Sequence, residues 1–392
     1  MNSRPLVILG VFPVAEVRTG GQKRYIELTR QLAEKGHRVF HLCRPGLAAS
    51  LPGTGIGVIP DELSGFLIPR WWRYRRWIIK RISTVRRALE AEGIRAPDVV
   101  LAFGETNFHA ARAVARLFSV PLVFALRNNF VDEVRTLGLL RYRLPLPRRL
   151  ERWLQLQWYL HLERSICLGS DALVLQTDHD RQVILSRNPE ASDRAVVIPN
   201  SFRVSWLSEA LAKANDSRSL EGGIYVGHLN ERKGVRYLFE ALARLGGRLP
   251  FEVVGFGGLE EWCRGYVRDQ GLSESVVFHG RQDRPLELIA GADLLIVPSL
   301  FDSFPNTVLE ALYAGTPVIG SDAPGGCRSS RAPTRGARRR PGGVSPGAGG
   351  LRRAPSRLRL RLGGELVGAL PAACGVACRS RGSASGARRG PD

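Results

Sequence analysis

The chain has 392 residues, enough for two domains of ordinary size, and its 44% hydrophobic content is typical of a globular protein with a buried core. No apolar run approaches the roughly 20 residues of a membrane-spanning helix, so the sequence offers no such span. The net charge of +21 is uneven, because residues 327–392 hold fifteen Arg and two acidic residues and thus 13 of the 21 charges.

Six Cys are scattered along the chain, at spacings that match neither a zinc site nor a secreted disulfide framework. This usage indicates a reducing compartment, and we expect a cytoplasmic protein. The apolar run after Arg4 is compatible with a signal peptide. A Gly-Gly loop and an amphipathic helix follow it at once, which favours a first strand instead.

The pattern of apolar runs in residues 1–200 predicts a doubly wound α/β domain. A strand at 6–11 leads through Gly20 and Gly21 into a helix at 22–35. Glycine at the start of a helix lets a ligand approach the backbone, although an ordinary tight turn accounts for the pair as well. Further strands are expected at 37–43, 98–103, 121–126, 171–175 and 195–198, and further helices at 106–118, 148–168 and 178–186.

Asn128 and Asn129 follow the strand at 121–126. Polar residues at the carboxyl end of a parallel strand lie where doubly wound sheets bind ligands. The pair is therefore a candidate for substrate contact. A role as simple turn residues accounts for it equally well.

The segment 66–89 mixes Trp, Tyr and Ile with Arg and Lys and ends in a helical pattern. Such a segment can lie on an anionic membrane with Trp at the interface, which places the protein at the inner face of the cell membrane. A domain helix whose aromatic side chains face the sheet is the alternative. A second basic aromatic stretch at 148–168 joins this acceptor or membrane face. No recognised RNA or DNA module accompanies either stretch, so we expect no nucleic-acid partner.

A polar linker is expected at 201–221 and a second α/β domain at 222–326. Its strand at 223–227 precedes a loop from His228 to Gly234, and its strand at 276–278 precedes Arg281. Residues 292–322 then read as strand, loop, helix and strand. Asp302 lies in that loop, and Glu310 lies in the helix that follows Asn306. Free N–H groups at a helix start suit phosphate, and the two carboxylates suit hydroxyl groups.

The segment PSLFDSFPNTVLEALYAGTPVI, residues 298–319, resembles the E-x7-E motif of family 4 glycosyltransferases. These are retaining enzymes with the α/β fold named GT-B, in which two doubly wound, Rossmann-like domains face a cleft. Asp302 stands where the family usually has Glu. Pro199-Asn200-Ser201 is similar to the I-P-N-G hinge. The loop from His228 is similar to G-R-L-x-x-x-K-G, with His228 in place of Arg and Lys233 as the Lys.

The resemblance implies a UDP- or GDP-sugar donor, a saccharide or lipid-linked acceptor, retention at the anomeric carbon, and no cofactor or metal. Glu310 would accept hydrogen bonds from the ribose and Asp302 would face the sugar hydroxyls, as the catalytic acids. The implied substrate-binding residues are Gly20, Gly21, Asn128, Asn129, His228, Lys233, Arg281, Phe304, Pro305, Asn306 and Thr307.

Residues 327–392 lack Lys, Ile, Phe, Tyr, Trp, Met, His, Asn and Gln, which is typical of disorder or of translation in a wrong frame. Cys327-Arg328-Ser329-Ser330 can be encoded TGC CGG AGT TCC. A preceding G and a shifted frame give GTG CCG GAG TTC, or Val-Pro-Glu-Phe, as expected in the family. We therefore expect a frameshift after residue 326 and an incomplete second domain.

Three other functions stay open on the sequence. The first alternative is an inactive remnant that only binds nucleotide. The second is a protein that binds nucleic acid through its basic tail. The third is a nucleotide-sugar epimerase, which shares the two-domain layout. Titration with UDP and GDP, deletion of the tail and product analysis distinguish these functions.

Overall fold

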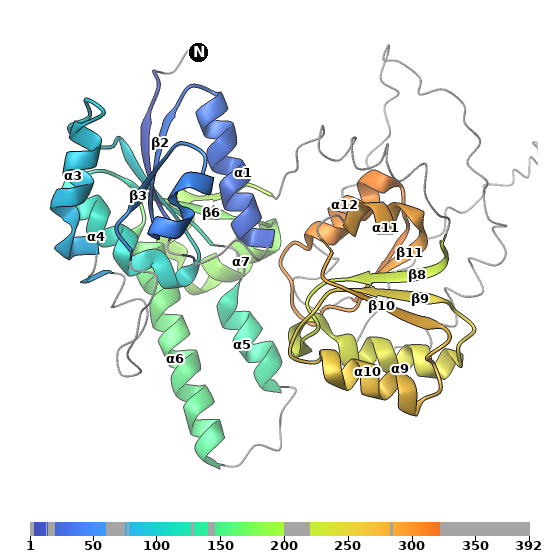
Figure 1. The fold of residues 1–392 in the computed structure, drawn as a ribbon. Coiled ribbons are helices and arrows are strands. Elements are labelled where there is room, and N and C mark those ends of the chain that lie inside the picture. Colours follow the sequence, from blue (N-terminus) through green and yellow to red (C-terminus); the bar gives the residue numbers. More distant parts are fainter. Residues whose placement is uncertain are drawn as a thin grey trace, which may run out of the picture. The chain divides into compact units, whose positions relative to one another are not determined.

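The computed structural model describes residues 4–12, 14, 20–59, 75, 76, 78–126, 129–139, 146–199, 220–282 and 285–321. The chain divides into an N-terminal unit of residues 1–203 with 301–306 and a C-terminal unit of the remaining residues. Each unit contains its own parallel β-sheet (Figure 1). The predicted pair of α/β domains is thus confirmed.

The N-terminal sheet has the strand order β3-β2-β1-β4-β5-β6-β7, and all of its neighbouring strands are parallel. The chain order reverses between β1 and β4, as in a doubly wound fold. All the predicted strands form, and a further one, β3, was not predicted. The strands are β1 (Val7–Val11), β2 (Arg38–Cys43), β3 (Thr54–Gly57), β4 (Val99–Phe103), β5 (Leu122–Ala125), β6 (Ala172–Leu175) and β7 (Ala195–Val197).

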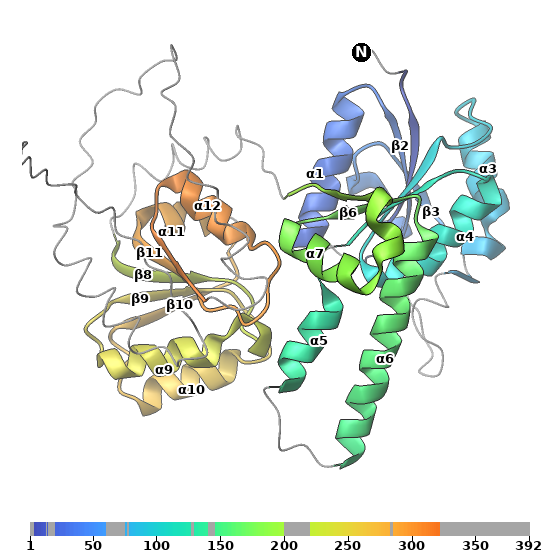
Figure 2. The same cartoon turned by 180° about the vertical axis from the view of Figure 1, so that it is seen from behind.

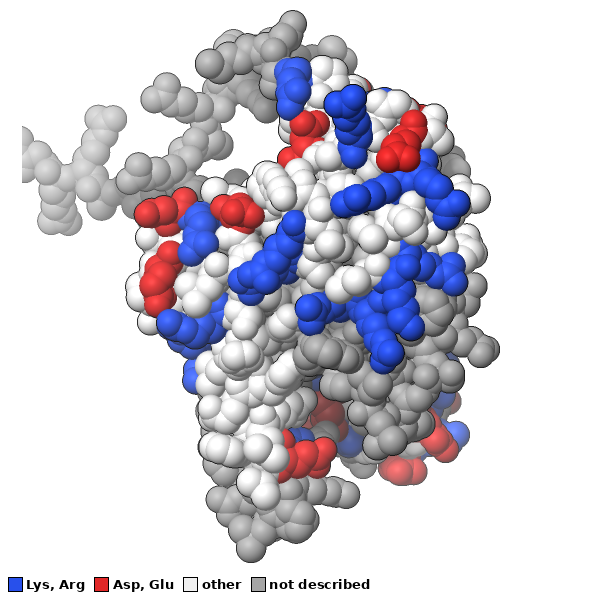
Figure 3. Space-filling view, turned by 90° about the vertical axis from the view of Figure 1, so that its left-hand side faces the viewer, with Lys and Arg blue, Asp and Glu red and all other residues white. Residues whose placement is uncertain are grey.

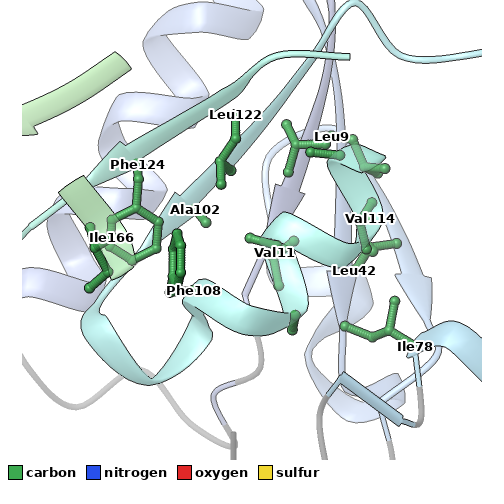
Figure 4. Close-up of a cluster of buried hydrophobic side chains, with 14 of the residues drawn as sticks. Leu9, Val11, Leu42, Ile78, Ala102, Phe108, Val114, Leu122, Phe124 and Ile166 are labelled. Atoms are coloured by element: carbon green, nitrogen blue, oxygen red, sulfur yellow. The ribbon is translucent and has the colours of Figure 1, made fainter. Parts of the chain in front are cut away.

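Helices cover both faces of this sheet (Figures 1 and 2). One apolar core lies between the sheet and α1. A larger apolar core lies between the sheet and the helices α3, α4 and α6. In Figure 4, Phe108 and Val114 of α4 and Ile166 of α6 lie against Leu9, Ala102 and Phe124 of the strands. The helices are α1 (Gly20–Glu34), η1 (Pro45–Ser50), α3 (Ile82–Glu90), η2 (Glu105–Asn107), α4 (Phe108–Phe118), α5 (Phe130–Leu139), α6 (Leu146–Gly169), α7 (Asp178–Arg187) and η3 (Pro189–Arg194).

The basic aromatic segment 66–89 is described only in part, since residues 66–74 and 77 lie outside the described residues. Its C-terminal part forms α3, which buries Val85 and Leu89 against the sheet. This part therefore fits the alternative of a domain helix. No helix among the described residues is both long and apolar enough to cross a membrane.

A charge network centred on the buried Glu163 joins α5, α6 and α7. Arg187 of α7 donates two hydrogen bonds to the Glu163 carboxylate of α6, at 2.8 and 2.7 Å, and one to Asp132 of α5, at 3.0 Å. Glu163 is only 1% exposed. Burial lowers the pKa of Arg187, but Glu163 and Asp132 outweigh it and hold that pKa above its ordinary value. The network fixes the base of the α5–α6 hairpin.

A second buried polar cluster lies beneath β1. The Tyr25 hydroxyl donates to His41 Nδ1 at 2.9 Å, and His41 Nε2 lies 2.7 Å from the Pro52 carbonyl oxygen, to which it donates. Burial lowers the pKa of His41 to about 4, so the ring is neutral near pH 7. The Tyr25 ring stacks on Phe12 with centroids 4.3 Å apart. Gly10 is required here, because a Cβ atom would overlap the Tyr25 hydroxyl.

The C-terminal sheet has the order β10-β9-β8-β11-β12, and all of its pairs are parallel. Helices α9 and α10 cover one face, while α11 and α12 cover the other (Figures 1 and 2). The elements are β8 (Leu220–Val226), η4 (Glu231–Lys233), α9 (Val235–Leu245), β9 (Phe251–Val254), α10 (Glu260–Asp269), β10 (Val276–Gly280), α11 (Pro285–Gly291), β11 (Ala292–Val297), α12 (Asn306–Ala314) and β12 (Val318–Gly320).

Two strands of the C-terminal unit extend beyond their predicted bounds. Strand β8 begins at Leu220, inside the linker expected at 201–221, because Leu220 pairs with Ala292 of β11. Strand β10 continues to Gly280 instead of ending at Phe278, since Gly280 pairs with Val254 across a bulge. Both extensions depend on a partner strand that is distant in sequence. The rest of the predicted linker, 201–219, lies outside the described residues.

Candidate functional site

Three predicted substrate-binding residues lie at one edge of the C-terminal sheet. His228 follows β8, Lys233 ends the short helix η4, and Arg281 follows β10. The His228 ring meets Phe256, which follows β9, edge to face with centroids 4.9 Å apart. The Arg281 guanidinium lies 5.8 Å from the centroid of the same Phe256 ring. The structure therefore brings His228 and Arg281 together around Phe256, at the carboxyl edge where such sheets bind ligands.

Close backbone contacts hold the loops of this edge. The Leu300 amide donates to the Arg232 carbonyl oxygen at 2.9 Å, which joins the loop after β8 to the loop after β11. Gly234 has a φ of +66° and lies so close to Pro298 that a Cβ atom would overlap the Pro298 carbonyl. Gly255 likewise has no room for a Cβ atom beside the Gly227 carbonyl. Only glycine fits both positions, which accounts for the glycines of these loops.

The local electrostatics of this edge are positive. Burial lowers the pKa of His228 below its ordinary value, and the nearby charges of Lys233, Arg232 and Arg281 lower it further. His228 is therefore mostly neutral near pH 7 in the unliganded protein. A bound anion would favour the imidazolium form, because it places negative charge beside the ring. The edge is suited to a phosphate-bearing ligand.

The His228 environment predicts pH-dependent nucleotide binding. We expect the affinity for UDP or GDP to rise several-fold as the pH falls from about 7.5 toward 6, because binding then takes up a proton on His228. Isothermal titration in buffers of different ionisation enthalpy measures that proton. The His228→Arg variant should bind more tightly with less pH dependence, since its charge is permanent.

The phosphate of the nucleotide also titrates near pH 6, so it contributes its own pH dependence to the measured affinity. The His228→Gln variant is the control for this contribution. That titration is common to both proteins, so the difference between wild type and His228→Gln isolates the imidazole. An equal pH dependence in wild type and His228→Gln would contradict the role of His228.

The two predicted acids flank the start of α12. Asp302 lies in the loop between β11 and α12 and is partly exposed, whereas Glu310 is 8% exposed in the second turn of the helix. The helix is fixed by Val308 and Ala311, which are buried in the core between α11, α12 and the sheet. Asn306 is the first helical residue, although we expected it to precede the helix. Phe304, Pro305 and Thr307 are described in the same segment, and their predicted ligand contacts stay predictions.

The predicted residues of the N-terminal unit have more varied surroundings. Gly20 and Gly21 form the first turn of α1, where N–H groups have no partner within the helix. Asn128 lies outside the described residues. Asn129 is 2% exposed, and its side-chain oxygen accepts from the Asp132 amide at 3.1 Å and from Arg187 at 3.0 Å. Asn129 thus has a clear structural role as a cap of α5, and its contact with substrate stays a prediction.

Two residues of the C-terminal edge were missed by the sequence analysis. Phe256 was not selected as a site residue, although its ring contacts both His228 and Arg281. Tyr225 of β8 donates from its hydroxyl to the His228 carbonyl oxygen at 2.8 Å and so fixes the start of the loop. The available signal was an aromatic residue at or just beyond the end of each adjacent strand.

Comparisons with known sequences match each of the two units to a glycosyltransferase family. A family described as Glycosyltransferase Family 4 matches residues 19–205, and one described as Glycosyl transferases group 1 matches residues 222–336. Lipopolysaccharide 1,6-galactosyltransferase of Salmonella typhimurium is 34% identical over 137 residues, which are 33% of this chain and 38% of that protein. The chain covers between 27% and 43% of the first four curated relatives.

A longer match and a solved structure define family and fold. Anabaena HepE, solved with UDP and glucose, superposes with a TM-score of 0.57 at 16% identity over 82% of each chain, which confirms the predicted GT-B fold. The lipopolysaccharide core biosynthesis glycosyltransferase LpsE of Rhizobium meliloti is 33% identical over 313 residues, covering 78% of this chain and 76% of that protein. With both domains matched in this way, the chain belongs to the family 4 glycosyltransferases.

Proposed function

We propose that this protein transfers a sugar from a nucleotide-sugar to a saccharide or lipid-linked acceptor, with retention, during synthesis of lipopolysaccharide or another cell-surface polysaccharide. The observation that carries the proposal is the positive edge that Arg232, Lys233 and Arg281 form around His228. Relatives named for lipopolysaccharide synthesis support the acceptor class. The HepE complexes with UDP and UDP-glucose support a nucleotide-sugar donor.

In the proposed reaction the acceptor oxygen bonds to the anomeric carbon while the bond from that carbon to the donor diphosphate breaks. The diphosphate leaves with the electron pair, and the charges of Lys233 and His228 stabilise it. Retention brings the acceptor to the face that the diphosphate leaves, so the departing oxygen can take the acceptor proton. Side chains supply the charge neutralisation, and no step is assigned to a metal or other cofactor.

Glu310 is assigned to the ribose hydroxyls of the donor. We expect Glu310→Gln to weaken UDP or GDP binding roughly tenfold or more, since a hydrogen bond to a charged group contributes about 1.5–3 kcal/mol. Isothermal titration measures this change. The same substitution at Glu261, which is exposed on α10, is the matched control and should leave binding unchanged.

A 2′,3′-dideoxynucleotide separates a direct contact from a general disturbance of the buried site. It lacks the hydroxyls assigned to Glu310, so wild type and Glu310→Gln should bind it equally. Wild-type affinity for UDP and GDP in Glu310→Gln would remove Glu310 from the site. A screen of nucleotide-sugars then identifies the donor.

We also propose that residues 327–392 are read in a shifted frame. Their composition supports this, as does the restored Val-Pro-Glu-Phe sequence, and the family match ends at residue 336, within this tail. Strand β12 is an edge strand of the described sheet, and Leu312 and Tyr313 of α12 are exposed, which fits an incomplete second domain. Sequencing across codons 320–330 tests the proposal. A continuous frame together with the tail peptides in a mass spectrum of the protein would refute it.

A further inference from the structure

The α5–α6 hairpin of the N-terminal unit carries a row of exposed apolar side chains. Leu150, Trp153, Leu154 and Trp158 of α6 are 58%, 56%, 53% and 37% exposed. Their spacing of three, one and four residues places them along one side of the helix. Large apolar side chains that gather on one exposed surface, rather than singly, mark a contact site. We call these four residues the α6 stripe.

The hairpin that carries the α6 stripe projects from a fixed base. In Figures 1 and 2, α5 and the N-terminal half of α6 extend beyond the edge of the sheet. The C-terminal half of α6 is anchored in the core by Leu162 and Ile166, and Glu163 binds Arg187 of α7. The stripe lies on the projecting half. It is therefore presented by a helix whose position is set by a buried ion pair.

The surface beside α6 is strongly basic. Figure 3 shows Lys and Arg across the middle of one face of the molecule, with acidic side chains toward its margins. Helix α4 contains no acidic residue, and α3 ends in its single one, Glu90. Among the described residues of 75–90 and in α4, the exposed cations are Arg76, Lys80, Arg81, Arg86, Arg87 and Arg116.

The basic surface and the α6 stripe are contiguous through two histidines. His109 of α4 lies close enough to Arg75, Arg112 and His161 of α6 that, after burial, their charges lower its pKa. The His161 ring in turn lies 6.5 Å from the Trp158 ring, centroid to centroid. Trp158 is thus the point at which the apolar stripe meets the cations.

We propose that the α6 stripe docks on an anionic lipid bilayer, with its Trp and Leu side chains in the interface and the adjacent cations over the lipid headgroups. Tryptophan favours this depth because its ring is apolar and its N–H group is polar, and each nearby Lys or Arg adds attraction to an anionic surface. The inference goes beyond sugar transfer, and it assigns the apolar anchor to α6 rather than to the segment 66–89.

Charge favours lipid over a second copy of the chain. Two copies that met through this face would bring their cationic surfaces together, and like charges in contact disfavour association. An anionic bilayer complements both parts of the surface. The partner is therefore identified by its chemistry, as an apolar layer beneath negative headgroups.

The test is cosedimentation of the full chain with phosphatidylglycerol–phosphatidylethanolamine vesicles. We expect the double variant Trp153→Gln, Leu154→Gln to bind at least about tenfold more weakly than wild type, because two apolar side chains that enter the bilayer in the proposed complex are lost. Leu168→Gln is the matched control on the same helix, since Leu168 is 42% exposed but lies at its anchored end. It should bind like wild type.

The comparison is repeated at about 1 M salt, where the screening length falls to about 3 Å. The Arg-rich tail is present in every variant, so its contribution cancels when the vesicle affinities of two variants are compared. The apolar contribution to binding should persist at high salt. Because the substituted side chains are exposed, the fold should be retained, and Leu154→Gln alone serves should the double variant unfold.

Two results would overturn the proposal. One is vesicle binding that is absent in wild type or unchanged by the double variant. The other is self-association of wild type in sedimentation velocity that the double variant abolishes, because the stripe would then join two copies of the chain.

Discussion

Replacing Arg187 with methionine is expected to lower the free energy of unfolding of the N-terminal unit by about 3–5 kcal/mol. The substitution removes the charged partner of the Glu163 carboxylate, which is 1% exposed, together with two of its hydrogen bonds, and leaves it the bond from the Asn188 side-chain amide at 2.9 Å. It also removes the bond from Arg187 of α7 to Asp132 of α5 and the bond to Asn129, the cap of α5. Scanning calorimetry of the full chain measures the loss.

Arg164→Met provides a matched comparison on α6. Arg164 pairs with Glu190 at 3.1 Å, but these side chains are 55% and 47% exposed. An exposed pair contributes about 0–1 kcal/mol, so this variant should unfold close to wild type. In the double variant Arg187→Met, Glu163→Met the buried charge is removed with its partner, and part of the stability should return. Equal effects of Arg187→Met and Arg164→Met would show that the buried network is not stabilising.

Replacing Lys233 with methionine is expected to reduce kcat/KM for sugar transfer by about 10²–10³-fold, the effect of removing one preorganised group from a developing negative charge. Lys233 follows Asn230, whose side chain accepts from the Lys233 amide at 3.0 Å and fixes the turn. The backbone of Lys233 is therefore held in a fixed turn at the positive edge of the sheet, and its side chain extends from that turn. Initial rates with the donor found by the nucleotide-sugar screen measure the effect.

The same substitution at Lys35, an exposed residue at the end of α1, controls for the general loss of a positive charge and should leave the rate unchanged. Lys233→Arg keeps the charge but changes its geometry, so it should recover part of the rate. If Lys233→Met raised KM for the donor without lowering kcat, Lys233 would bind the ground state only. Wild-type kcat/KM in Lys233→Met would exclude Lys233 from the reaction.

The sequence revealed those elements whose signals are local. Strand β1 and helix α1 follow from an apolar run, a Gly pair and helical spacing, and α12 follows from Asn306, Leu309 and Gly315 in the same way. Strand β3 lacks such a signal, because Thr-Gly-Ile-Gly has weak strand propensity and is held by pairing with β2. Helix α5 contains Gly138, which weakens the helical pattern.

The candidate site was predictable where a motif carried it. His228, Lys233 and Arg281 were each selected from a loop after a strand, and the parallel sheet places those loops at one edge. The partners of Asn129 were beyond such reasoning. Arg187 is 58 residues away in sequence, and nothing local to either residue indicates that they meet. The same residue types are favoured in turns and at helix caps, so only the three-dimensional structure distinguishes the two roles of Asn129.

Under the proposed function, the close approach of the Gly255 and Gly227 backbones has a consequence for how the choice of donor can be redesigned. An insertion or deletion in either loop would separate two backbone segments that lie in close contact. The lengths of these loops should therefore be kept in a redesign. Side chains that project from the interlocked backbone remain adjustable, and Phe256 is the first of these because it is shared by His228 and Arg281. A library intended to change the accepted nucleotide should vary residues such as Phe256 and leave the glycines alone.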